Sequence, residues 1–288
     1  MSVPLPQASA AGTVTLGGDL RVNRLGFGAM RLSGRGIWGD PKDRAGACQV
    51  LRRAVELGVN FIDTADAYGP ETNERLIADA LHPYPSGLVI ATKGGLTRPA
   101  PDEWHRKATP AHLRAVCEGS LQRLRVDRID LYQLHSPDPR VPIEDSIGEL
   151  ARLQLQGKIR HIGVSNFSVA ELRRAQTIAK IVSVQNRYNV SDRSSDDVID
   201  FCEREGLAFI PWYPLAAGDH TSSRGGSAEL KRIVSEQNAT PAQAALAWLL
   251  MRSRLTLPIP GTSSIAHLEE NVAAATIAAR HMASAGRQ

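Results

Sequence analysis

Short apolar runs alternate with longer amphipathic stretches along almost the whole chain. Eight runs of six or seven residues are rich in valine, isoleucine, leucine and alanine, as strands buried on both faces are. We predict these strands at residues 25–30, 60–65, 88–93, 129–135, 159–165, 183–188, 208–213 and 255–260. The stretches between them predict helices at residues 43–57, 71–81, 109–124, 143–156, 168–180, 194–205, 229–238 and 265–279. Eight alternating units in 288 residues favour an α/β fold, a closed (β/α)8 TIM barrel, for which about 250 residues are typical.

Further segments complete this plan. Residues 13–26 alternate around a Gly17-Gly18-Asp19 turn and predict a β-hairpin, and residues 240–251 predict one extra helix before the last unit. Helix starts are marked by Thr-Pro pairs at 109–110 and 240–241 and by capping-box spacing at 168–171. Residues 1–11 are predicted to be a flexible tail, and residues 12–288 show no linker composition, so we expect a single domain there.

The composition changes this picture little. Hydrophobic residues make up 42% of the chain, and the net charge of +4 is spread without basic runs, so we expect no nucleic-acid partner. Cys48, Cys117 and Cys202 are few, odd in number and far apart, which predicts neither disulfides nor a metal site and suits a reducing cytoplasm. No apolar run is long enough to span a membrane, and no secretory signal is expected at the N-terminus. None of these features predicts the oligomeric state.

Residues 34–39, GRGIWG, match the glycine pattern of a Rossmann dinucleotide site and follow a predicted strand. In that site a helix begins at the glycines, so that its N-terminus faces the pyrophosphate. Here Asp40-Pro41 intervene, and the helical pattern resumes only near Asp43. We therefore interpret this segment as a loop over the mouth of the barrel.

Ionisable residues cluster at the predicted ends of adjacent strands, where barrel enzymes carry their active sites. Asp63 and Tyr68 follow the second strand, Lys93 ends the third, and His135 ends the fourth. Each alone is better explained as a solvated charge, a turn residue or a hydrogen-bonded histidine. Together they predict an acid site in which a lysine cation lowers the pKa of a tyrosine, an aspartate keeps the lysine charged, and a histidine orients a carbonyl oxygen.

Such a site has no electron source of its own, so reduction needs a cofactor. Ser165, Asn166 and Gln185, at the ends of the next two strands, can bond an amide, and Trp212 can stack on a flat ring. These features suit a nicotinamide, although Trp212 fits a core position equally well.

The motifs GVNFIDTADAYG, VIATKGG, LQRLRVDRIDLYQLHSPDP, GKIRHIGVSNFS, VQNRYN and LPIPGTSSIAHLEENV, in this order, resemble the aldo-keto reductase superfamily between about residues 21 and 271. The resemblance implies a barrel closed at the bottom by the N-terminal hairpin, NADPH binding without a Rossmann fold, and reduction of small aldehydes or ketones. It places the catalytic tetrad on Asp63, Tyr68, Lys93 and His135, with the tyrosine as general acid. It gives Asp66 no catalytic position, and we expect that residue to serve the turn.

The resemblance also implies a cofactor site, with Trp212 at the ring-stacking position. Its residues are Gly28, Ala29, Met30, Asp63, Ser165, Asn166, Gln185, Trp212, Tyr213, Leu215, Ala217, Gly218, Gly261, Thr262, Ser263, His267, Glu270 and Asn271. Many members have a lysine and an arginine for the 2′-phosphate where this chain has Gly261 and His267. NADPH is still expected over NADH, because Thr262, Ser263 and a helix start at Ile265 remain.

Two alternatives differ in class from a reductase. One is a regulatory module that binds the cofactor with little turnover, and the other is a cofactor-free lyase or isomerase with Lys93 as a Schiff base. Steroid-handling members of the superfamily shape their pockets with a long C-terminal loop that is missing here, so the resemblance implies an open pocket. It would be framed by loops 31–42, 96–107 and 216–226, with Trp38 and Trp104 as apolar contacts.

Overall fold

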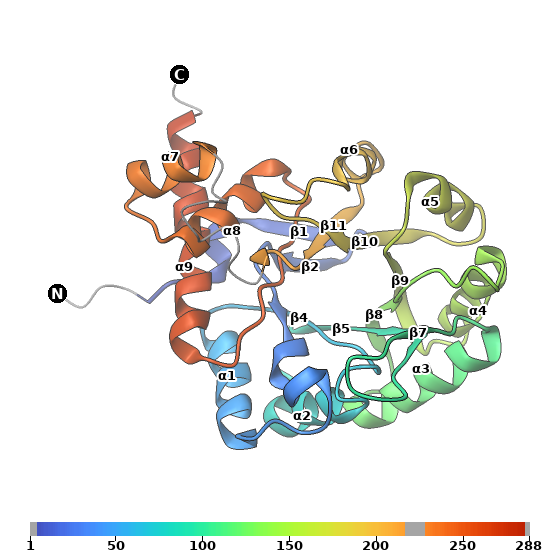
Figure 1. Ribbon diagram of the computed structural model, residues 1–288. Coiled ribbons are helices and arrows are strands. Elements are labelled where there is room, and N and C mark those ends of the chain that lie inside the picture. The colour runs from blue at the N-terminus through green and yellow to red at the C-terminus, as the bar shows by residue number, and fades with distance from the viewer. Residues whose placement is uncertain (1–4, 217–227, 286–288) are drawn as a thin grey trace.

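The computed structural model describes residues 5–216 and 228–285 and contains a curled parallel sheet surrounded by helices (Figure 1). Seven strands hydrogen-bond in the order β11-β10-β9-β8-β5-β4-β3. Their bounds are β3 Phe27–Gly28, β4 Phe61–Asp63, β5 Val89–Gly94, β8 Ile129–Leu134, β9 Ile159–Ser165, β10 Ile181–Arg187 and β11 Ala208–Trp212. Every predicted strand of this set is present, and β9 has its predicted bounds. The first is shorter than predicted because residues 29–32 form the 3-10 helix η2 (Ala29–Leu32).

The segment at residues 255–260, predicted as the eighth strand, closes the barrel although it is not a regular strand. On one side it pairs with β11 through Phe209 N–H to Leu255 O (2.9 Å) and Leu257 N–H to Phe209 O (2.8 Å). On the other side Gly26 N–H donates to Pro258 O (2.9 Å) next to β3. Because Pro258 and Pro260 have no N–H, the ladder stays incomplete. The (β/α)8 barrel is thus confirmed, and this segment takes the place of its eighth strand.

Helices cover the outside of the barrel, as the alternation predicts. They are α1 Arg44–Glu56, α2 Thr72–Leu81, α3 Pro110–Leu124, α4 Ile143–Leu155, α5 Val169–Gln176, α6 Asp196–Glu205, α7 Ala228–Gln237, α8 Pro241–Arg252 and α9 Ile265–Ala285. The extra helix before the last unit is confirmed as α8. Capping boxes start α5 at Ser168 and α8 at Thr240, whereas the Thr109 side chain makes no cap bond and α3 begins with proline alone.

The N-terminal hairpin closes the lower end of the barrel. Strands β1 (Thr13–Leu16) and β2 (Leu20–Asn23) turn Val14, Leu16, Leu20 and Val22 inward. These side chains form one apolar cluster with interior residues of the strands, such as Phe61. A second, larger cluster lies between the strands and the surrounding helices. The hairpin thus fills the interior of the barrel from below, at the end opposite to the carboxyl ends of the strands.

Packing begins earlier in the chain than the predicted tail allows. Ala8–Ala11 form the 3-10 helix η1, in which Ala8 and Ala11 are buried. The Ala8 N–H donates to Leu57 O at the end of α1 (2.9 Å). Small alanine side chains fit closely here, so the segment at residues 8–11 belongs to the packed structure and not to a tail.

The glycine-rich segment at residues 34–39 does not form a Rossmann site. It contains only the short 3-10 helix η3 (Arg35–Ile37), and α1 starts later, at Arg44. Gly69 N–H donates to Ile37 O (3.2 Å) and Gly39 N–H to Gly69 O (2.9 Å), so the loop is attached to the turn that follows β4. Among residues 5–216 and 228–285, no helix combines the length and apolar character of a membrane span.

Candidate active site

A cavity of about 930 Å³ lies at the carboxyl ends of the strands. Its walls include Tyr68 and His135 of the predicted tetrad together with the Asp63 carboxylate. The predicted cofactor residues that line it are Gly28, Met30, Asp63, Ser165, Asn166, Gln185, Trp212, Tyr213, Leu215, Gly261, Thr262, His267, Glu270 and Asn271. The fold thus brings residues from most of the chain to one hollow.

Two of the predicted cofactor residues do not line the cavity, and two others are not described. Ala29 is fully buried behind the wall, where its carbonyl accepts a bond from Asn73 (2.9 Å). Ser263 is exposed and does not line the cavity. Ala217 and Gly218 lie outside the described residues. Ala29 faces the interior packing and Ser263 faces solvent, so their assignment to the cofactor stays a prediction that the cavity lining does not support.

Lys93 and Asp63 form a fully buried ion pair beneath the cavity. The Lys93 Nζ lies 2.5 Å from Asp63 Oδ1 and also donates to Thr64 O (2.8 Å) and Tyr68 OH (3.3 Å). Burial lowers the pKa of the Lys93 ammonium, but the Asp63 charge and Tyr68 more than compensate and the pKa is raised overall. The lysine is therefore charged, as the sequence predicts.

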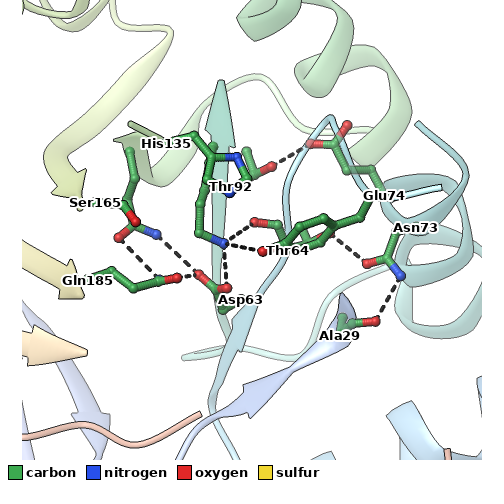
Figure 2. A network of polar contacts seen from close by, with 12 residues as sticks. Ala29, Asp63, Thr64, Asn73, Glu74, Thr92, His135, Ser165 and Gln185 are labelled. Carbon is green, nitrogen blue, oxygen red and sulfur yellow. Dashed lines mark hydrogen bonds and ion pairs between the residues drawn. The ribbon is translucent and has the colours of Figure 1, made fainter. Parts of the chain in front are cut away.

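The Asp63 carboxylate has donors on both oxygens. Its Oδ2 accepts from Gln185 Nε2 (2.8 Å), as Figure 2 shows, and from Gln133 Nε2 (3.1 Å). Its Oδ1 accepts from Lys93 Nζ. A buried carboxylate needs such partners to remain in place. Asp63 is thus held from three strands, and it holds Lys93 in turn.

Tyr68 and His135 face each other at the bottom of the cavity. Their rings lie 5.8 Å apart at 82°, and both side chains are almost fully buried. Burial raises the pKa of the Tyr68 phenol, and the Lys93 charge lowers it only in part. Burial, reinforced by Lys93, moves the pKa of His135 well below its usual value. The site therefore holds a protonated phenol and a neutral imidazole at neutral pH. The Lys93 cation lowers the pKa of the tyrosine, as predicted, but burial raises it by more.

A chain of hydrogen bonds behind the site fixes the segment that carries Tyr68. The Thr64 hydroxyl donates a hydrogen bond to Asn73 Oδ1 (2.7 Å), and Asn73 Nδ2 donates to Ala29 O (2.9 Å) (Figure 2). Asn73 N–H donates to Tyr68 O (3.2 Å). Asn73 thus connects the turn after β4 to η2 and limits movement of the phenol.

The amide residues predicted for the cofactor are tied to one another. Asn166 has a left-handed backbone (φ 62°), and its Nδ2 donates to His135 O (3.0 Å). Its Oδ1 accepts from Trp212 Nε1 (3.1 Å), which fixes the indole at the cavity wall. Among the described residues, Gln185 Oε1 has no recorded partner, so it is available as an acceptor. Together with the Ser165 hydroxyl, these groups fit a planar carboxamide.

The sequence analysis missed residues that now have clear positions. Gln133 lies two residues before His135 on β8, so the strand alternation could have placed it on the same face. Arg31 directly follows Gly28, Ala29 and Met30, which were predicted to contact the cofactor, and it lines the cavity. The other additions are Ile37, Leu96, Pro214, Pro241, Ala242, Ile259 and Pro260. They lie in loops, in the segment at residues 255–260 and at the start of α8, and only the tertiary structure decides which of their side chains face the cavity.

Of the two tryptophans predicted at the rim, Trp104 lines the cavity and Trp38 does not. The Trp104 ring lies 6.3 Å from the Tyr68 ring and 6.4 Å from the His135 ring. The buried Arg98 guanidinium stacks on Trp104 at 3.8 Å and donates to Gly36 O (2.8 Å) and Ile37 O (3.2 Å). One arginine thus connects both loops and holds an aromatic wall over the tyrosine.

Asp66 lies in the turn, as predicted, but its carboxyl group is buried away from the cavity. Its Oδ1 has no hydrogen-bond partner, and burial followed by the charge of Glu74 raises the pKa of Asp66 well above the usual value. Glu74 itself is paired with Arg123 (2.6 Å). Asp66 is therefore expected to be protonated over a wide pH range, with no part in the acid site.

We expect Asp66→Asn to be more stable than the unchanged protein at neutral pH. A group whose folded pKa is raised contributes stability below its unfolded pKa, near 3.9, and loses that contribution as the pH rises towards the folded pKa. The isosteric amide removes this loss. The stability difference should therefore grow by at most about 1.4 kcal/mol per pH unit above pH 4. Urea unfolding of both proteins over this range measures it, and parallel stability curves would contradict the buried-acid assignment.

Comparisons with known proteins agree with this geometry. A family model described as "Aldo/keto reductase family" matches residues 24–284. The chain is 49% identical over 270 residues to a Schizosaccharomyces pombe protein named "Uncharacterized oxidoreductase C215.11c", covering 94% of this chain and 87% of the relative. It is 44% identical over 272 residues to "Pyridoxine 4-dehydrogenase" of Escherichia coli, covering 92% and 93%. An aldo/keto reductase from Klebsiella pneumoniae in complex with NADP and acetate has the same fold, with a TM-score of 0.77, 26% identity, and coverage of 96% and 94%.

Proposed function

The chain belongs to the aldo/keto reductase family of oxidoreductases, and from this premise we propose that it reduces aldehydes and ketones to alcohols with NADPH. The observation that carries the proposal is the pairing of Tyr68 with Lys93 under an open cavity, with the hydroxyl and ammonium groups 3.3 Å apart. Among the described residues no group of three or more histidine, cysteine, aspartate or glutamate side chains is placed to hold a metal ion. A phenol beside an ammonium group can protonate a carbonyl oxygen, because the positive charge stabilises the phenolate that is left.

The bound cofactor would supply a hydride to the carbonyl carbon, and the side chains would handle the proton. Tyr68 donates its phenolic proton to the oxygen on which negative charge develops. Lys93 stabilises the resulting phenolate, since its charge lowers the pKa of the tyrosine against the effect of burial. The neutral His135 ring carries one N–H donor, which can orient the carbonyl oxygen.

The cofactor assignment rests on donors, acceptors and a ring of the right kinds. Ser165, Asn166 and Gln185 would bind the carboxamide, with Trp212 beside the nicotinamide. At the other end of the cavity Thr262 precedes the start of α9, where unpaired N–H groups and the helix dipole favour a phosphate. The NADP bound by the Klebsiella pneumoniae relative supports NADPH over NADH.

We propose small planar carbonyl compounds as the substrates. Trp104 lines the cavity with its ring 6.3 Å from the Tyr68 ring and at 80° to it, so the wall beside the tyrosine is aromatic and suits a flat ring. The relative named pyridoxine 4-dehydrogenase makes pyridoxal a reasonable member of any test panel. The three cysteines are buried and unpaired, in line with the proposed cytoplasmic location.

The test combines binding with turnover. Tryptophan fluorescence is titrated with NADPH and with NADH, and NADPH oxidation is followed with a panel of aliphatic aldehydes, aromatic aldehydes and pyridoxal. We expect tighter binding of NADPH and turnover of at least one carbonyl class. Binding without turnover across the panel would favour the regulatory module, and trapping of substrate on Lys93 by borohydride without any cofactor would favour the Schiff-base enzyme.

Arg98 gives a prediction about substrate selection. We expect Arg98→Met to release Trp104 and to raise KM for aromatic aldehydes several-fold, while the NADPH Kd stays within about twofold. Small aliphatic aldehydes, which do not need the aromatic wall, should be affected less. Steady-state kinetics measure this, with Arg106→Met on the exposed strand β7 (His105–Arg106) as the control. Equal KM changes for both aldehyde classes would contradict the role of Arg98 in positioning Trp104.

A further inference from the structure

Arg31 is the only lysine or arginine among the described residues that line the cavity. It lies in η2, directly after Met30, and its side chain is exposed at the cavity wall. No hydrogen bond or ion pair is recorded for its guanidinium within the described part of the chain. An unpaired arginine at a binding cavity is ready to bind an anion.

The backbone opposite Arg31 excludes a cationic side chain from that wall. A Cβ at Gly261 would lie 2.4 Å from the carbonyl oxygen of Gly28, and this neighbour is backbone that cannot rotate away. The same built Cβ would be only 3.6 Å from Cγ of Arg31. The absence of a side chain at Gly261 thus lets two chain segments approach, and the arginine stem lies over the glycine.

The other ionisable groups that line the cavity do not neutralise the negative charge of a dinucleotide. Asp63 is neutralised by Lys93 below the cavity, and the other ionisable lining residues include Glu270 and His267 near the start of α9. NADH carries two negative charges on its pyrophosphate, and NADPH has the additional 2′-phosphate. A lining of this kind has one permanent positive charge to offer these groups, and it is that of Arg31.

We propose that Arg31 binds a phosphate group of the dinucleotide, in place of the cation that the backbone excludes at Gly261. This inference rests on the proposed function, since it needs a dinucleotide in the cavity. The planar guanidinium can donate two parallel N–H bonds to phosphate oxygens, which a lysine at the same place cannot do.

The experiment measures binding and needs no turnover. Tryptophan fluorescence gives Kd for NADPH and NADH with the unchanged protein and with Arg31→Gln, Arg31→Lys and Arg35→Gln, at low and at high salt. Arg35 is the matched control, because it is an exposed arginine four residues away that does not line the cavity. Arg31→Gln and Arg35→Gln change the net charge equally, but only Arg31→Gln removes a side chain that lines the cavity.

We expect Arg31→Gln to weaken NADPH binding by about tenfold to a hundredfold, as for loss of a charged hydrogen bond, with a smaller salt dependence. Arg31→Lys should recover part of the affinity, and Arg35→Gln should change it less than about threefold. An effect on NADPH alone identifies the 2′-phosphate as the bound group, and equal effects on both cofactors identify the pyrophosphate. Unchanged Kd values in Arg31→Gln would overturn the inference alone, whereas an unchanged protein that binds neither cofactor would overturn the proposed function as well.

Discussion

Replacement of Tyr68 by phenylalanine is expected to lower kcat for carbonyl reduction by about a hundredfold to ten-thousandfold, the usual contribution of a positioned general acid. The ring, its contact with His135 and the cavity shape are kept, so the NADPH Kd should stay within about twofold. Loss of the 3.3 Å contact to Lys93 should lower the free energy of unfolding by only about 1 kcal/mol. Single-turnover measurements with NADPH and an aromatic aldehyde separate the chemical step from binding.

The control for this variant is Tyr84→Phe. Tyr84 also uses its hydroxyl in one hydrogen bond, to Leu124 O (2.7 Å), but it does not line the cavity. Its loss should reduce stability by a similar amount and leave kcat unchanged. If Tyr68→Phe retained near-normal carbonyl reduction, the tyrosine would not be the acid, and the proton would have to come from His135 or water.

The dependence on pH follows from the burial of the tyrosine. Because burial raises the pKa of Tyr68, its protonated form persists at and above neutral pH, and activity should decline only on the alkaline side. His135 has its pKa lowered by burial and Lys93, so it should not titrate near neutrality. A rate profile that instead falls between pH 6 and 8 would implicate an imidazole of ordinary pKa.

Much of the fold was predictable because each βα unit has its own local pattern. Residues 159–165 form a strand with the predicted bounds, and the caps at Ser168 and Thr240 depend on neighbours within three residues. The segment at residues 255–260 was predicted as an ordinary strand, but Pro258 and Pro260 interrupt its ladder of hydrogen bonds. The packed helix at residues 8–11 was missed because the segment has no apolar period of its own and is ordered by its contact with Leu57.

The site was predictable where barrel geometry fixes it and not where loops do. Asp63, Lys93 and His135 end adjacent strands, so their convergence follows from the topology. Arg98 stacks on Trp104 and donates to the carbonyls of residues 36 and 37, so it joins two loops that are about sixty residues apart in the sequence. No local sequence pattern reveals such a contact. The net direction of the Tyr68 pKa depends on how fully the phenol is buried, and this is a property of the packed structure.

Lys93→Met is expected to damage stability and catalysis together. It removes the cation that lies 2.5 Å from Asp63 and leaves a carboxylate buried with only the two glutamine amides as donors. Loss of one partner of a buried pair typically costs about 3–5 kcal/mol of folding free energy. Without the lysine charge, burial and the charge of Asp63 both raise the pKa of Tyr68, so its anion is less stable and kcat should fall by at least about a hundredfold. Urea unfolding and single-turnover kinetics measure the two effects.

A second substitution separates the two roles of the lysine. In Lys93→Met with Asp63→Asn no charge is left unpaired, and the asparagine oxygen can still accept from the Gln185 amide. We expect this double variant to recover most of the lost stability, because its pocket is neutral, and none of the lost kcat, because the tyrosine still has no cation beside it. Recovery of kcat together with stability would mean that Lys93 only holds the fold. If stability stayed low as well, the damage would come from the lost packing of the lysine stem and not from the unpaired buried charge of Asp63.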